Sequence, residues 1–134
     1  MRGWPIACDA DRVGLRCLLV DDNTALLEAM RLLLEREGVT VVGMASSAAE
    51  ALRQAGALCP DVVLVDIALG DENGFDLVRR LADHGSCGQM TVILISTRSE
   101  ADYADLIAES PAAGFLPKAE LSAAAIRRIL GRSS

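Results

Sequence analysis

Short runs of apolar β-formers alternate with longer segments of helical periodicity, and the alternation repeats five times along the chain. The short runs are rich in Val, Ile and Leu, as in Val62–Val65, and several of them end directly before a polar or charged residue. Strict alternation of strands and helices predicts a parallel sheet whose two faces are both covered by helices.

The pattern also predicts where the elements lie. We expect strands at residues 15–20, 39–45, 62–65, 91–95 and 113–116, and helices at residues 23–37, 47–56, 75–84, 100–109 and 122–130. Gly38, Pro111 and Gly131 are expected to end helices, and Ser47 to Glu50 reads as a capping box. Residues 68–74 are expected to form a loop. The fold class is therefore α/β, a flavodoxin-like (βα)5 doubly wound parallel sheet with strand order 2-1-3-4-5.

Composition limits the functional classes. The 134 residues suffice for one domain, which we place at residues 15–131, with an extension at 1–14 and a tail at 132–134. A net charge of −6 argues against direct nucleic-acid binding. No membrane span or signal peptide is evident, so a cytoplasmic location is expected. The cysteines form no C-x-x-C pair and are expected to be reduced, structural thiols: Cys8, Cys17, Cys59 and Cys87.

Polar groups follow four of the five predicted strands. Asp21 and Asp22 follow the first strand, Asp66 the third, Ser96 the fourth and Lys118 the fifth. Ligands bind at the carboxyl edge of such a sheet, where the first and third strands lie side by side. Carboxylates ~4 Å apart repel by about 4 kcal/mol at an effective dielectric near 20, and Mg²⁺ would compensate. Asp66 alone ends the central strand, which makes it the candidate nucleophile for an aspartyl-phosphate.

This combination of motifs resembles the response-regulator receiver domain of two-component signalling, over residues 15–130. The gaps from Asp22 to Asp66, from Asp66 to Ser96 and from Ser96 to Lys118 are 44, 30 and 22 residues, which match that family's usual spacing. The resemblance implies that Asp66 is the phospho-acceptor. It also implies that Asp21, Asp22 and Asp66 hold Mg²⁺ together with the backbone carbonyl of Ala68.

The same resemblance implies a switch. Ser96 and Lys118 would bind the phosphoryl group, and Phe115 stands at the switch-aromatic position. A histidine kinase or phosphotransfer protein would be the partner, and the surface of the fourth helix, fifth strand and fifth helix would bind a target or a second copy in a homodimer. Residues 114–121 look most like receivers that carry a helix-turn-helix output, although a stand-alone receiver stays open. Ala119 follows Lys118 where the family often has proline in a cis bond, and a cis bond to a residue other than proline costs ~2.5–4 kcal/mol.

Two other functions stay open at this point. An aspartyl-phosphate phosphatase would be an enzyme, but its site needs a second acid two positions after the nucleophile, where this chain has Ala68. A flavodoxin-like module that binds a cofactor would need phosphate-binding hydroxyls after the first strand, where Asp21 and Asp22 stand, or a histidine near Asp66. We therefore expect no enzymatic activity beyond the chain's own Mg²⁺-dependent phosphorylation and dephosphorylation.

Overall fold

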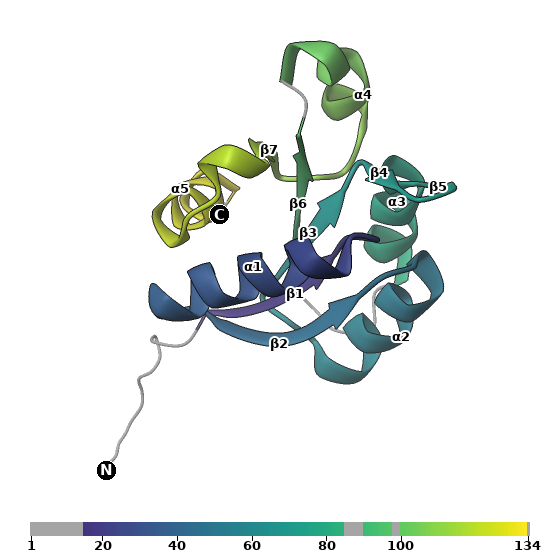
Figure 1. Cartoon of the computed structure of the whole chain (residues 1–134). Helices are drawn as coiled ribbons and strands as arrows, with labels where there is room; N and C mark the ends of the chain where they lie inside the picture. Colours follow the sequence, from purple (N-terminus) through teal and green to yellow (C-terminus); the bar gives the residue numbers. More distant parts are fainter. Residues whose placement is uncertain (1–14, 85–89, 98–99, 134) are drawn as a thin grey trace.

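The computed structural model describes residues 15–84, 90–97 and 100–133; the predicted extension at residues 1–14 lies outside them. Five parallel strands form one sheet in the order β2-β1-β3-β6-β7, and helices cover both faces (Figure 1). This is the predicted 2-1-3-4-5 order, so the fold class is confirmed. The strands of this sheet are β1 (Arg16–Val20), β2 (Thr40–Ala45), β3 (Val62–Asp66), β6 (Thr91–Ser96) and β7 (Gly114–Pro117).

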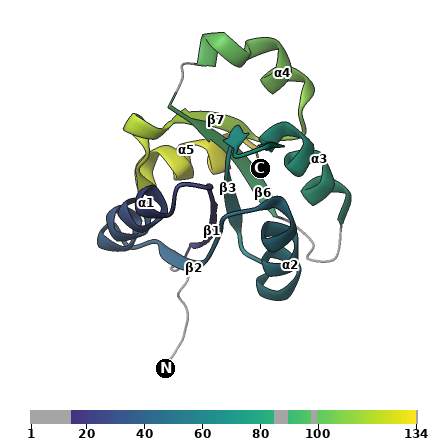
Figure 2. The ribbon, with the colours of Figure 1, turned by 45° about the vertical axis from the view of Figure 1, so that its right-hand side comes forward.

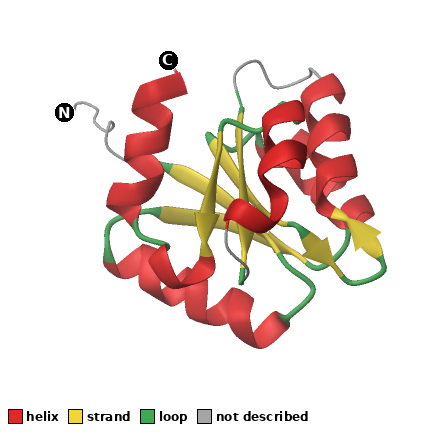
Figure 3. Ribbon diagram, turned by 90° about the horizontal axis from the view of Figure 1, so that it is seen from above, coloured by secondary structure: helices red, strands yellow, loops and turns green. Residues whose placement is uncertain are grey.

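Each strand of this sheet is followed along the chain by a helix, with a short hairpin inserted between β3 and α3 (Figure 2). Figure 3 shows the helices packed around the sheet from another direction. No helix among the described residues is long and apolar enough to cross a membrane. The α-helices are α1 (Thr24–Arg36), α2 (Ala48–Leu58), α3 (Gly74–His84), α4 (Ala104–Glu109) and α5 (Ala123–Ser133), and the 3-10 helices are η1 (Glu100–Tyr103) and η2 (Lys118–Glu120).

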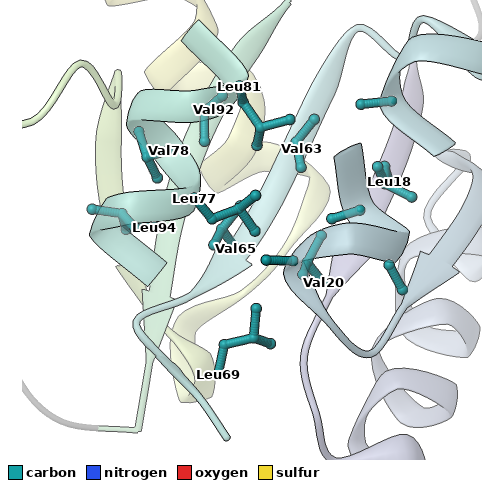
Figure 4. Close-up of a cluster of buried hydrophobic side chains, with 14 of the residues drawn as sticks. Leu18, Val20, Val63, Val65, Leu69, Leu77, Val78, Leu81, Val92 and Leu94 are labelled. Carbon is teal, nitrogen blue, oxygen red and sulfur yellow. The ribbon is translucent and has the colours of Figure 1, made fainter. Parts of the chain in front are cut away.

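Two hydrophobic layers hold the sheet between the helices. Successive side chains of a strand point to opposite faces, so β1 sends Leu18 and Val20 toward α2 and α3 and sends Leu19 toward α1 and α5. Figure 4 shows the first of these layers, in which Leu69, Leu77 and other side chains pack together. The central strand β3 is buried along its whole length, as expected for a parallel sheet covered on both faces.

The ends of α1 follow from local sequence. The side chain of Asn23 caps its first turn. After the helix, Gly38 has φ +94°. The N–H of Gly38 donates to the carbonyl of Glu35 at 3.1 Å, and the N–H of Val39 donates to the carbonyl of Leu34 at 2.9 Å. This is a Schellman ending, which needs the left-handed backbone that glycine adopts without strain. The prediction that Gly38 ends the helix is confirmed.

Helix α2 departs from the prediction at both ends. The hydroxyl of Ser47 accepts from the N–H of Glu50, as in a capping box, but the Glu50 carboxylate accepts from the N–H of Ser46 and so reaches one residue further back. The helix also runs to Leu58 and does not stop near Gly56. Its extra residues are held from outside the helix, because the guanidinium of Arg16 donates to the carbonyl of Leu58 at 2.8 Å.

Three further expectations need correction. The segment 100–109 is not one α-helix, since its first turn, Glu100–Tyr103, is a 3-10 helix. Helix α5 continues through Gly131 to Ser133. Residues 68–74 are not a plain loop, because β4 (Ala68–Leu69) and β5 (Glu72–Asn73) pair as a short antiparallel hairpin.

The cysteine prediction is partly wrong. Cys17 is a free thiol in β1 with no exposed surface, as expected, and burial raises its pKa to about 12. Cys59 is disulfide-bonded, so the expectation of a reduced thiol is wrong there. Cys8 and Cys87 lie outside the described residues.

Candidate functional site

Three carboxylates meet at the carboxyl edge of the sheet. Asp66 is the last residue of β3, and Asp21 directly follows β1, which pairs with β3 in register at Val20 and Val65. Carboxylate oxygens of Asp21, Asp22 and Asp66 all lie within 4.8 Å of one another. Asp21 and Asp66 are buried, whereas Asp22 is exposed. The structure therefore brings together the three acidic residues that the strand pattern placed in one cleft.

Lys118 contacts two of these three carboxylates. It begins the 3-10 turn η2 after β7, and its Nζ lies 2.6 Å from Oδ2 of Asp21 and 3.1 Å from Oδ2 of Asp66. Burial lowers the pKa of this ammonium, but its hydrogen bonds to Asp21 and Asp66 outweigh the burial, so the net pKa is raised. The Lys118 ammonium bridges two carboxylates and stays charged.

The Asp66 carboxyl has a perturbed pKa. Burial raises it, the charge of Asp21 raises it further, and the hydrogen bond from Lys118 opposes both, with a result of about 6. The N–H of Ala68 also donates to Oδ1 of Asp66, at 3.2 Å. Asp21 has a second donor as well, because the N–H of Asn23 lies 2.9 Å from its Oδ1. One ammonium thus leaves the repulsion between the two buried carboxylates only partly offset.

Ser96 and Phe115 occupy the neighbouring strands. Ser96 is the buried last residue of β6, paired with Pro117 of β7, and Ile95 before it pairs with Asp66, so the hydroxyl belongs to the same edge of the sheet. Phe115 is only 8% exposed and lies in the hydrophobic layer on the α2 and α3 face. The aromatic ring therefore packs in the core in this structure, one strand away from Ser96.

The hairpin β4–β5 is a part of the site that the sequence reading missed. Gly70 sits at its turn with φ +61°, and a Cβ built there would lie 3.4 Å from Oδ2 of Asp22. At the far end of the hairpin, a Cβ on Gly74 would overlap the carbonyl oxygen of Asp66. The Gly70-Asp71 dipeptide is a recognised turn signal for a two-residue hairpin and could have revealed it.

The donor set suits a hard divalent cation. Mg²⁺ prefers carboxylate and carbonyl oxygens and is usually bound by one or two carboxylates together with waters. Three carboxylates around one point supply such donors, and the exposed position of Asp22 gives solvent and ligand access. A cation there would relieve the repulsion that raises the pKa of Asp66. The residues present therefore fit a magnesium ion.

The comparisons with known proteins all indicate the same protein family. The sequence profile of the response regulator receiver domain matches residues 17–130. A candidate transcriptional regulator of Pseudomonas aeruginosa is 38% identical over 106 residues, which cover 78% of this chain and 50% of that protein. The response regulator GacA of Pseudomonas viridiflava is 31% identical over 105 residues, which cover 78% of this chain and 48% of GacA. The chain thus spans about half the length of these relatives.

A solved structure extends the comparison to the fold. A response regulator protein from Burkholderia pseudomallei, solved with a phosphorylated aspartic acid, a calcium ion and citrate, superposes with a TM-score of 0.73 at 26% sequence identity. The match covers 86% of this chain and 65% of that chain.

Proposed function

Because the chain belongs to the response regulator receiver domain family, we propose that it accepts a phosphoryl group on Asp66 from a histidine kinase or phosphotransfer protein. The observation that supports this most directly is the convergence of Asp66 with Asp21, Asp22 and the ammonium of Lys118 at one edge of the sheet. We assign the receiver unit to residues 15–131.

Each residue of the site has a separate role in the proposed phosphoryl transfer. Asp21, Asp22, Asp66 and the backbone carbonyl of Ala68 hold Mg²⁺, which supplies positive charge to the transferring phosphoryl group when bound. An oxygen of the Asp66 carboxylate attacks phosphorus, so that a new O–P bond forms while the bond from phosphorus to the donor's imidazole nitrogen breaks. The released imidazole takes up a proton. Lys118 is already within 3.1 Å of the carboxylate and pairs with the phosphoryl oxygens.

The phosphoryl group then acts as a switch. It adds negative charge and acceptor oxygens, to which Ser96 donates from the adjacent strand end. Movement of Ser96 toward Asp66 repacks Phe115 and the elements beside it, α4, β7 and α5, which form the surface that a partner or a second copy reads. Helix α4 suits this role because it is only six residues long and has no fully buried residue.

The relatives suggest what the switch controls. The matched residues make up only 48% of GacA and 50% of the transcriptional regulator of Pseudomonas aeruginosa, so a separate output domain in a longer regulator of transcription is the proposed reader of the phosphorylated state. The Burkholderia protein was solved with a phosphorylated aspartic acid and a calcium ion, which supports an aspartyl-phosphate and a divalent cation as features of this chain's function.

Intact-mass spectrometry tests the proposal. Incubation with acetyl phosphate and Mg²⁺ is expected to add one phosphoryl group to the wild-type chain, and chelation of the metal is expected to prevent it. Asp66→Asn removes the nucleophile and is expected to stay unmodified, whereas Asp71→Asn, a change of the same type on the exposed hairpin, is expected to behave like the wild type. Undiminished labelling of Asp66→Asn would disprove the assignment.

A further inference from the structure

We propose that Glu72 is a positioning residue: by anchoring the β4–β5 hairpin to the amino end of α2, it holds that hairpin in place beside the candidate metal site. The inference rests on the proposed function, because the groups that it positions are Ala68, a proposed metal ligand, and Gly70, which lies against Asp22. It assigns a role to an exposed carboxylate that touches neither Asp66 nor Lys118 in any contact described above.

The anchoring contact joins two distant parts of the chain. Oε1 of Glu72 lies 2.8 Å from the backbone nitrogen of Ala48, across 24 positions of sequence. Ala48 is the first residue of α2, so its N–H has no acceptor within the helix. A carboxylate at this place makes a charge-assisted hydrogen bond and also lies at the positive end of the helix dipole. The contact therefore favours one position of the hairpin over others.

The hairpin needs such an anchor, because two residues per strand cannot hold a hairpin by backbone pairing alone. Its first strand is fixed by Leu69, which is 1% exposed in the hydrophobic layer that also contains Ala48. Its end is fixed at Gly74, whose N–H donates to the carbonyl of Ile67 at 2.9 Å. Glu72 supplies the polar attachment on the second strand, directly opposite Leu69 in the register.

The hairpin in turn sets two features of the site. Ala68 pairs with Asn73, so the backbone at the proposed carbonyl ligand moves with the second strand. Gly70, at the turn, approaches the carboxylate of Asp22 and limits where that exposed side chain can lie. Loss of the Glu72 contact would let the backbone at Ala68 and the side chain of Asp22 move away from the positions described. Removal of a partner bonded directly to a metal ligand typically costs 10–100-fold in metal affinity. Glu72 acts on the ligands only through the hairpin, of which it is one of three anchors, so we expect the lower end, about tenfold.

Three variants separate the hydrogen bond from the charge. Glu72→Ala removes the acceptor and the charge, Glu72→Gln keeps an acceptor oxygen and removes the charge, and Asp71→Ala removes a neighbouring charge from the same exposed turn. Mg²⁺ binding is measured by isothermal titration calorimetry without a phosphoryl donor. Glu72→Ala is expected to weaken binding about tenfold, whereas Glu72→Gln and Asp71→Ala are expected to stay within about threefold of the wild type.

A second measurement does not depend on metal. Amide hydrogen exchange, followed by NMR in metal-free buffer, is expected to be faster at Ala48 and at residues 68–73 in Glu72→Ala than in Asp71→Ala. Equal Mg²⁺ affinity in Glu72→Ala and Asp71→Ala would reduce the effect to charge and overturn the proposal. Unchanged amide exchange at Ala48 in Glu72→Ala would also overturn the proposal. So would a loss of Mg²⁺ affinity in Glu72→Gln as large as the loss in Glu72→Ala. If the wild-type chain itself bound no Mg²⁺, the proposed function would fail, and the role of Glu72 in positioning a metal site would fail with it. The exchange data would still decide whether Glu72 anchors the hairpin.

Discussion

Replacement of Asp66 by asparagine should stabilise the metal-free protein, and the gain should grow with pH. The pKa of Asp66 rises from 3.8 to about 6 on folding, because burial and the charge of Asp21 disfavour the ionised form. An acid with a raised pKa binds its proton more tightly in the folded state. The contribution of Asp66 protonation to the stability of the folded protein is therefore complete below pH 4 and is lost as pH rises through about 6.

The size of the effect follows from the shift. Roughly two pKa units correspond to about 3 kcal/mol between the acid and alkaline limits, and roughly half of this change falls between pH 5 and pH 8. Asparagine at position 66 cannot ionise, so it is not subject to this loss. The free energy of unfolding of Asp66→Asn minus that of the wild type should rise by about 1.5 kcal/mol over that range.

Urea unfolding in EDTA, followed by circular dichroism at several pH values, measures this difference. Asp22→Asn is the matched control, because Asp22 carries the same group in the same cluster but is exposed. A difference between Asp66→Asn and wild type that stays constant or shrinks as pH rises would refute the reasoning. Excess Mg²⁺ should reverse the order, since it stabilises only a chain with the complete carboxylate set.

Three further changes test other contacts. Lys118→Met leaves the buried carboxylate of Asp21 without its ammonium partner and should lower the free energy of unfolding in EDTA by about 3 kcal/mol, as read from urea curves at pH 7.5. Gly74→Ala places a Cβ against the Asp66 carbonyl and should cost about 2 kcal/mol in the same assay, whereas Gly131→Ala, which meets nothing within 4 Å, should be neutral or stabilising. Leu69→Ala should cost about 3 kcal/mol in thermal or urea unfolding, because that side chain is 1% exposed; a loss below about 1 kcal/mol would show that it is not a core anchor.

Local sequence was sufficient for the sheet and for the approximate helix positions. Apolar runs specified β1, β3 and β6, and Asn23 and Gly38 specified the two ends of α1, because each of these features acts within a few residues. The carboxylate cluster was also predictable, since strand order alone places the ends of β1 and β3 side by side. The errors in α2 arose where distant residues decide the local structure, whereas the missed β4–β5 hairpin has a local signal in Gly70 and Asp71.

Helix α2 shows the difference most clearly. Its carboxyl end extends to Leu58 because Arg16, 42 positions earlier, donates to that residue's carbonyl, and its amino end receives Glu72 from the hairpin. Neither contact leaves a local pattern. The continuation of α5 through Gly131 has a different cause: glycine is unfavourable in a helix by only about 1 kcal/mol, which the buried side of α5, including Ile126 and Ile129, outweighs.

The labelling rate of the buried Cys17 thiol can be used to measure how often the sheet opens. It lies in β1 between β2 and β3, has no exposed surface, and its pKa of about 12 leaves almost no thiolate at neutral pH. A thiol reagent reacts with the thiolate, so alkylation of Cys17 must wait until β1 separates from its neighbours. The labelling rate of this one atom, followed by mass spectrometry after digestion, would therefore report how often the centre of the domain opens, with and without a ligand at its edge.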